Sequence, residues 1–181
     1  GLVSSLTDLV NSLTLEQNNT TCSTKGTPPA SAEELLERIR DDYQIRNYLW
    51  TGDIDLACFD ENCTFTDPTL SFTGTDTFVR NVQNLKRIVD QLIDDSSPRS
   101  DLLDIRLEKK FVQTRWNMVG ELKVLPWKPR IDVIGTTKFW FDQQYRVVVY
   151  DEQWEMPAWK ALLQLVTPAG TIESTNKAKN L

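Results

Sequence analysis

The 181-residue chain contains no histidine, and this absence limits the chemistry that its side chains can do. Ser-His-Asp and Cys-His catalysis, most zinc sites and histidine-ligated haem all depend on an imidazole, so they are excluded. Proton transfer must therefore use Asp, Glu, Tyr, Lys or Cys. The three cysteines are too few for a disulfide scaffold, and no further soft ligands accompany Cys58 and Cys63. This pair is predicted to be reduced and partly buried, with no metal bound.

A carboxylate near the C-terminal end is one candidate for acid–base work. The apolar runs 131–141 and 145–154, separated by three polar residues, predict an antiparallel hairpin. If Phe141 pairs with Tyr145, Thr137 and Phe139 lie on a face that is apolar except for Asp151 and Gln153. An acid on such a face has a buried partner or a raised pKa, and both are typical of sites. Asp151 is therefore a candidate acid, although a one-residue slip would exchange the two faces.

Aromatic residues are candidates for ligand contact, together with Thr137 and Phe139 on the same predicted face. Six tryptophans are many for this length, and Trp116 and Trp127 could line a pocket for a large flat molecule. Trp127 lies between two prolines in a stiff loop and could act as a gate. The simpler interpretation is core and interface packing. Arg115 could pair with an acidic group of the ligand, or form a surface ion pair of little energetic value.

The composition divides the chain into three parts. Residues 1–31 are rich in Ser and Thr and poor in charge, which is typical of a transit-peptide remnant or simply of a polar, flexible leader. Residues 32–166 hold the periodic patterns of a folded domain, and the polar tail 167–181 is predicted to be disordered. The net charge of −6 argues against a nucleic-acid binder, and no apolar stretch is long enough to span a membrane.

The order of elements predicts the fold class. Ser31 and Glu34 form a capping box for a first helix that continues to Gly52, and Thr75 begins a second, strongly periodic helix. A brief strand is expected at 63–66, and long strands follow from residue 102 onward. Helices that precede a meander of strands predict an α+β fold in which the helices pack on one face of a curved antiparallel sheet.

Several motifs resemble a known superfamily. The stretch from Phe59 to Pro68, continuing through Phe72-Thr73-Gly74, is similar to the second conserved block of the nuclear-transport-factor-2-like superfamily, also called SnoaL-like or ketosteroid-isomerase-like. Further features resemble a plastid and cyanobacterial family of unknown function. They are Asp67-Pro68, Asn81, Asn84-Leu85, Pro126-Trp127, Gly135-Thr136 and Glu152-Gln153-Trp154. The resemblance covers about residues 32–166 and implies a cone-shaped fold that holds a small apolar molecule.

The resemblance also implies site residues. In ketosteroid isomerases the acid before this proline is the general base, which implies that role for Asp67, whereas Asp-Pro is also an ordinary turn opening. Those enzymes use a tyrosine of the first helix to hold an oxyanion. One alignment places Ile45 at this position and another places Tyr43, and helical periodicity favours Tyr43 because it shares the inward stripe. Tyr43 is equally explained as a core aromatic with a satisfied hydroxyl.

Three functions follow as hypotheses. The first is a plastid module, in the stroma or peripheral to the thylakoid, that holds an apolar or tetrapyrrole-like molecule without transforming it. Joining of the plastid family to a haem-binding domain in some plant proteins suggests the tetrapyrrole. The second is an isomerase, cyclase or dehydratase with Asp67 as base and Tyr43 or Asp151 as acid. The third is an assembly scaffold that binds through its sheet, as superfamily homodimers do.

Overall fold

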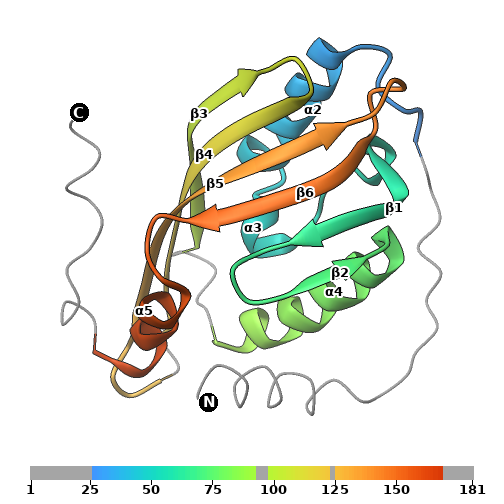
Figure 1. Ribbon diagram of the computed structural model, residues 1–181. Coiled ribbons are helices and arrows are strands. Elements are labelled where there is room, and N and C mark those ends of the chain that lie inside the picture. Colours follow the sequence, from blue (N-terminus) through green and yellow to red (C-terminus); the bar gives the residue numbers. More distant parts are fainter. Residues whose placement is uncertain (1–25, 93–97, 123–124, 169–181) are drawn as a thin grey trace.

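The computed structural model describes residues 26–92, 98–122 and 125–168, with the side chains of 84–92 excepted. Six strands form one curved sheet in the order β2-β1-β6-β5-β4-β3, and α2, α3 and α4 lie on one face of it (Figure 1). The elements are α2 (Ala32–Gln44), α3 (Tyr48–Thr51), η1 (Leu56–Cys58), β1 (Phe59–Thr66), β2 (Ser71–Thr73), α4 (Thr75–Leu92), β3 (Arg99–Leu107), β4 (Phe111–Glu121), β5 (Arg130–Phe141), β6 (Val147–Trp154), α5 (Ala158–Leu163) and η2 (Gln164–Val166). The predicted α+β class is confirmed.

Helix α2 begins where the sequence predicts. The Ser31 hydroxyl accepts a hydrogen bond from Glu34 N at 3.2 Å, and Glu34 in turn accepts from Ala30 N at 2.8 Å, so both carry out the capping expected of them. The inward side of the helix buries Ile39 and Tyr43, each 1% exposed. Tyr43 therefore faces the sheet as its periodicity predicts, whereas Ile45 is 75% exposed beyond the end of the helix.

The expected single helix to Gly52 is wrong, because the chain turns sharply after Gln44. Asn47 adopts a left-handed conformation, φ 51°, which ends the first helical run and starts the short helix α3 in a new direction. Gly52, φ 66°, ends α3, and a side chain there would collide with Val82. The turn brings the hydroxyl of Tyr48 to 3.0 Å from that of Tyr43.

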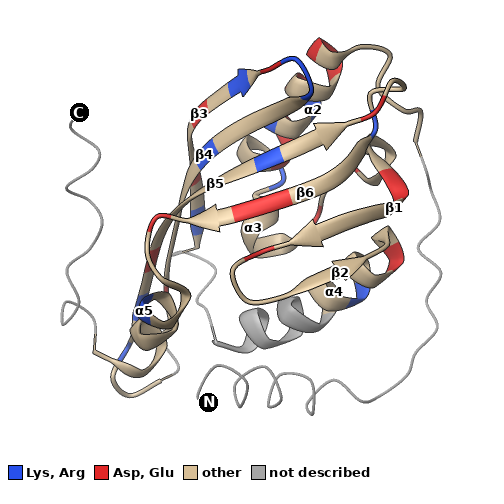
Figure 2. Cartoon of the chain, in the orientation of Figure 1, with Lys and Arg blue, Asp and Glu red and all other residues tan. Residues whose placement is uncertain are grey.

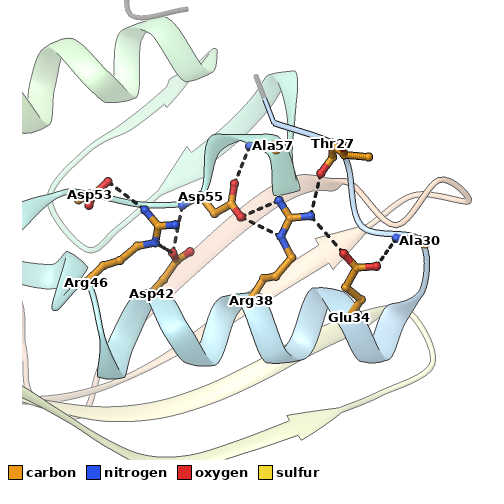
Figure 3. A network of polar contacts seen from close by, with 9 residues as sticks. All are labelled: Thr27, Ala30, Glu34, Arg38, Asp42, Arg46, Asp53, Asp55 and Ala57. Atoms are coloured by element: carbon orange, nitrogen blue, oxygen red, sulfur yellow. Dashed lines mark hydrogen bonds and ion pairs between the residues drawn. The ribbon is translucent and has the colours of Figure 1, made fainter. Parts of the chain in front are cut away.

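A polar network fastens the outer side of α2 to the segments that cross it (Figure 3). Arg38 contacts Asp55 through two nitrogens, at 2.7 and 2.6 Å, and donates to the carbonyl of Thr27 at 2.8 Å. One turn further on, Asp42 accepts from Asp55 N at 3.0 Å and lies 3.1 Å from Arg46 Nε. Burial raises the pKa of Asp42 to about 7. These contacts hold α2, and with it Tyr43, against the rest of the domain.

The C-terminal hairpin forms as predicted, but the predicted register of its strands is wrong. Thr137 pairs with Glu152 and Phe139 with Tyr150, whereas the expected partner of Phe139 is Val147. The connection is longer than expected, because Asp142 N and Oδ1 engage Arg146 across the turn, and a bulge next to Phe141 adds a further step.

From Val149 onward the offset is three residues, an odd number, so these side chains of β6 change face, whereas Val147, before the bulge, stays in the core. Asp151 consequently points to the outer face, across from Lys138, and Glu152 takes the inward position expected for Asp151. These two acidic residues lie in the C-terminal half of β6, beside the strand that carries Lys138 (Figure 2).

The sheet is mixed rather than wholly antiparallel, because β1 runs parallel to β6. Phe65 pairs with Tyr150 and Thr66 with Asp151, so both strands end at the same edge of the sheet. Asp67 directly follows β1 and, two residues after the buried Phe65, is on the inward side. The parallel pair thereby brings Asp67 and Glu152 to one place from positions far apart in the sequence.

A close approach in the centre of the sheet fixes Trp116. Its indole crosses directly over Gly135, the residue opposite it on β5. A Cβ atom at position 135 would overlap the indole and would lie 2.9 Å from the carbonyl oxygen of Gln153. The absence of a side chain at Gly135 therefore lets Trp116 lie flat in the core, where it is 1% exposed.

Parts of the predicted leader and tail lie outside the described residues. These are 1–25, with Cys22, and 169–181. Residues 26–30 run beside α2, where Thr27 meets Arg38. Among the described residues, no helix is long and apolar enough to cross a membrane. The thiols of Cys58 and Cys63 are free and buried.

Candidate functional site

Three tyrosine hydroxyls line up across the inner face of the sheet. Tyr48 donates to the Tyr43 hydroxyl at 3.0 Å, and the hydroxyls of Tyr48 and Tyr150 lie 3.1 Å apart. The Tyr43 hydroxyl also lies 2.8 Å from Thr114 Oγ1. Burial raises the pKa of all three tyrosines, so they remain protonated. The line joins helix α2 to β6 through α3.

Glu152 ends this line of hydroxyls. Its Oε2 lies 2.5 Å from the Tyr150 hydroxyl, and its Oε1 accepts a hydrogen bond from Trp154 Nε1 at 2.8 Å. Burial raises the pKa of Glu152 to about 7, the two hydrogen bonds oppose this effect, and the charge of Asp67 adds to it. Although its carboxyl is largely desolvated, the residue is only half-buried, as is Trp154. A carboxyl that titrates near neutrality can exchange a proton with a ligand that reaches it.

Asp67 has a structural task in addition to its place beside Glu152. Its Oδ1 accepts hydrogen bonds from Thr69 N, Thr69 Oγ1 and Leu70 N at 2.6, 2.5 and 3.0 Å, which closes the turn between β1 and β2. The turn opening is therefore confirmed, and catalysis by Asp67 stays a prediction. The half-buried side chain remains in electrostatic contact with Glu152.

Three of the predicted ligand-contact residues, on β4 and β5, pack beside the tyrosines and form what we call the floor of the site. Trp116 Nε1 donates to Thr137 Oγ1 at 2.9 Å, and Phe139 packs edge-on against Tyr150 with ring centroids 5.2 Å apart. All three side chains are buried, and Thr137 lies directly opposite Glu152 on β5. Tyr43 is equally enclosed, which makes it a core residue that reaches Glu152 only through the other tyrosines.

Three predicted site residues lie elsewhere. Arg115 is on the outer face, where it forms a bidentate ion pair with Glu155 at 2.5 and 3.0 Å. Trp127 is 41% exposed in the loop before β5, and its Nε1 donates to Leu165 O at 3.1 Å. Asp151 is on the outer face as well, as the register requires. The structure does not bring these residues to Glu152.

Sequence reasoning missed Glu152, Tyr48 and Tyr150 as site residues. The pattern Tyr150-x-Glu152-x-Trp154 was visible as a polar–aromatic stripe at the spacing of one strand face. The hairpin register expected from the sequence differs from the observed one by an odd number of residues, and it therefore places this stripe on the outer face. Tyr48 carries no signal of its own, since its position depends on the turn at Asn47.

Among the described residues we find no metal site, and three of the side chains that could ligate a haem iron are enclosed. No group of three or more described Cys, Asp or Glu side chains is arranged to hold a metal ion. Cys58 and Cys63 are fully buried and the Tyr43 hydroxyl is engaged, so none of these three side chains faces an open space. Burial raises the pKa of Cys63 to about 12, which keeps its thiol protonated and disfavours ligation.

A cavity of about 190 Å³ lies at the opposite end of β1 and β6. Its lining includes Pro28, Leu56, Phe59 and Arg146, which come from the segment before α2, from η1 and from the starts of the two strands. Arg146 already pairs with Asp60 at 3.2 Å and with Asp142 at 3.3 Å. Because the parallel strands run away from it, this cavity is separate from Glu152.

Comparison with solved structures identifies the fold. An NTF2-like protein from Burkholderia thailandensis matches with a TM-score of 0.55 and 13% identity, over 74% of this chain and 98% of that one. A protein from a soil-derived mobile gene cassette matches with a TM-score of 0.51 and 20% identity, over 71% and 95%. The epoxide hydrolase/cyclase-like enzyme SalBIII, which has a role in pyran ring formation in polyether salinomycin, matches with a TM-score of 0.50 and 14% identity, over 71% and 95%.

At these identities the likeness establishes the NTF2-like fold and nothing finer. No curated protein matches the chain. The model of one family covers residues 33–150, which is more than half of the sequence and includes every element from α2 to the middle of β6. The chain therefore belongs to the family described as uncharacterized conserved protein (DUF2358).

Proposed function

We propose that the protein binds a small, mainly apolar molecule against the inner face where β1 and β6 end, with the polar group of the ligand at Glu152. The observation that carries the proposal is the Glu152 carboxyl itself, placed among Tyr150, Trp154 and Phe139 on a residue that is only half-buried. A desolvated carboxyl costs stability, and a fold that needed only packing would favour an apolar residue here. Departures of this kind are typical of functional sites.

The surroundings define the ligand chemistry. The floor is aromatic and aliphatic, which favours an apolar body, and the charge of Asp67 beside Glu152 disfavours an anion. A neutral or cationic ligand with one hydrogen-bonding group therefore fits better than a carboxylate or phosphate. Trp154, half-buried beside Glu152, supplies a flat apolar surface for such a molecule.

Ligand-induced stabilisation tests this proposal. Neutral, cationic and anionic molecules of similar apolar body are added separately, and the melting temperature is recorded against concentration. Saturable stabilisation by neutral or cationic molecules is expected, and Glu152→Leu, which removes the hydrogen-bonding group, should weaken it about tenfold, the value of one hydrogen bond to a charged or acidic group. Asp151→Asn, the adjacent outer-face change, is the matched control. Equal stabilisation by the anionic set, or equal loss in both variants, contradicts the proposal.

A second candidate is an acid–base enzyme, an isomerase, cyclase or dehydratase. The observation that favours it is the pair of half-buried carboxyl groups, Asp67 and Glu152, of which Glu152 titrates near neutrality. Two carboxyl groups in different environments can divide the roles of base and acid. Asp67→Asn keeps the oxygen that accepts the three turn hydrogen bonds, so this variant is expected to remain folded and lose turnover. Unchanged turnover in folded Asp67→Asn excludes this reaction scheme.

Plastid location, a tetrapyrrole ligand and a homodimer through the sheet remain part of the proposal, supported by the family resemblance alone. A fluorescent fusion of the full precursor tests the location. A tetrapyrrole is included in the ligand panel, where the enclosed Cys58, Cys63 and Tyr43 predict no axial ligation and no shift of its absorbance band. Native mass spectrometry of the gently purified protein reports both a retained ligand and the oligomeric state.

A further inference from the structure

The donor direction at the far end of the line of hydroxyls leaves one contact without a proton if Glu152 is ionised. The line contains three contacts of 3.0, 3.1 and 2.5 Å, which join Tyr43, Tyr48, Tyr150 and Glu152 in turn. Each tyrosine hydroxyl has a single proton to donate. The geometry of the first contact makes Tyr48 the donor to Tyr43. Tyr48 therefore has no proton left for Tyr150.

The remaining two contacts both draw on Tyr150. If Glu152 is a carboxylate, Tyr150 donates to it, and the oxygens of Tyr48 and Tyr150 face each other at 3.1 Å with no proton between them. If Glu152 is a carboxylic acid, it donates to Tyr150, Tyr150 donates to Tyr48, and Tyr48 donates to Tyr43. Tyr43 then donates to Thr114, 2.8 Å away. With Tyr48 donating to Tyr43, only the acid form supplies every contact with a proton.

We propose that Tyr43 and Tyr48 are positioning residues that hold a proton on Glu152, so that the site presents a neutral acid with its proton shared inward along the tyrosines. Loss of that proton requires the line to reverse, with Tyr43 donating to Tyr48 and Tyr48 to Tyr150. In the reversed line Thr114 donates to Tyr43 and gives up its contact of 3.4 Å with the carbonyl of Thr137, and all these hydroxyls must turn together in a closely packed core.

The groups around Glu152 support the acid form. Asp67, from the turn after β1, acts on it with a like charge. On its own strand Tyr150 and Trp154 face it, and the opposite residue on β5 is the uncharged Thr137. No described cation lies among these partners. The raised pKa of Glu152 agrees with this direction of donation.

The proposal makes a prediction of unusual sign. Tyr48→Phe removes the group that requires the Tyr150 proton, so Tyr150 becomes free to donate to an ionised Glu152. Tyr43→Phe has the same effect one step removed, because the Tyr48 proton can then turn to Tyr150. Both variants should lower the pKa of Glu152 by about one unit, the value of one charge-assisted hydrogen bond. Tyr150→Phe removes the donor itself and should raise this pKa by about one unit.

Infrared difference spectroscopy of the full chain, recorded without ligand between pH 4 and 9, measures the protonation of Glu152 directly. The carbonyl band of the acid that disappears in Glu152→Gln is followed as the pH rises in the wild type and the three Tyr→Phe variants. A lower midpoint in Tyr48→Phe and Tyr43→Phe with a higher one in Tyr150→Phe is the expected result. If desolvation alone sets the midpoint, Tyr48→Phe and Tyr43→Phe leave it unchanged or raise it, and the proposal is overturned.

Two variants share the downward prediction, so the test survives the failure of either one to fold, which circular dichroism would reveal. The inference rests on the proposed function only in taking Glu152 as the group that meets the ligand. A negative result in the ligand-binding assay can be told apart from a negative result in the infrared titration, because the infrared titration contains no ligand. If no member of the ligand panel binds but the infrared midpoints of the variants shift in the predicted directions, the proton-holding role of Tyr43 and Tyr48 stands and the binding proposal fails.

Discussion

Glu152→Gln should make the protein more stable at alkaline pH, although it removes a charged residue that makes two hydrogen bonds. The amide oxygen can accept from Trp154 Nε1, and the amide nitrogen can donate to Tyr150 in place of the acid proton. The variant thus imitates the protonated form of Glu152 at every pH. It removes the cost of ionising a desolvated carboxyl and keeps the contacts of the neutral one.

The size of the effect follows from the shift in pKa. The folded protein holds the proton on Glu152 up to about pH 7, whereas the ordinary value of 4.5 describes the unfolded chain. The wild type therefore loses folding stability as the pH rises through this window. Since one unit is worth about 1.4 kcal/mol, the full loss is about 3 kcal/mol above pH 7. Asp42, whose pKa is also raised to about 7, steepens the same decline and is unaffected by the substitution.

Urea unfolding at pH 5 and pH 8 measures this effect. The difference in free energy of unfolding between Glu152→Gln and the wild type should be about 2 kcal/mol more favourable to the variant at pH 8 than at pH 5. Glu155→Gln is the matched control, because Glu155 is exposed and pairs with Arg115 on the outer face. A difference that is the same at both pH values, or a variant less stable at pH 8, would refute the reasoning.

Three further substitutions test the framework of the site. Gly135→Ala should lower the free energy of unfolding in urea by about 2 kcal/mol and alter the fluorescence of Trp116, because the new Cβ overlaps the indole. An unchanged free energy of unfolding would contradict this close approach. Asp67→Ala should cost about 1–2 kcal/mol by leaving the turn amides without their acceptor, whereas Asp67→Asn should cost less than half as much; equal losses are inconsistent with the turn. Gln164→Ala should lower the free energy of unfolding by about 2 kcal/mol, because the buried Gln164 amide accepts from Asp132 N at 3.0 Å and donates to Asp132 O at 3.1 Å. A melting temperature within one degree of wild type would argue against this contact.

Local patterns predicted the elements on which the site is built. The capping residues and inward stripe of the first helix place Tyr43 in the core, and the strand runs give the order of β3 to β6. These features depend on residues close together in the sequence, where periodicity and capping chemistry act directly. The same reasoning selected Tyr43 over Ile45, which is exposed.

The acidic residue of the site required information that is not local. Asp151 and Glu152 are adjacent, and which of them faces inward depends on the parity of a hairpin register set by the Asp142 turn and a bulge. The approach of Asp67 to Glu152 depends on a parallel pairing between strands separated by most of the domain. Neither the bulge nor the parallel partner has a signature in one sequence, so the site could be placed on the correct strand but on the wrong face.

The most direct test of the central claim is a nuclear magnetic resonance titration of the tryptophan indole N–H groups. Trp154 donates its indole proton to Glu152, so its resonance reports any molecule that reaches this carboxyl. We expect a neutral apolar ligand to shift the Trp154 resonance in a saturable manner. The resonance of Trp159, which is 61% exposed, should not shift. A ligand that saturates the protein while shifting only Trp159 or Trp127, with Trp154 unmoved, would contradict this expectation.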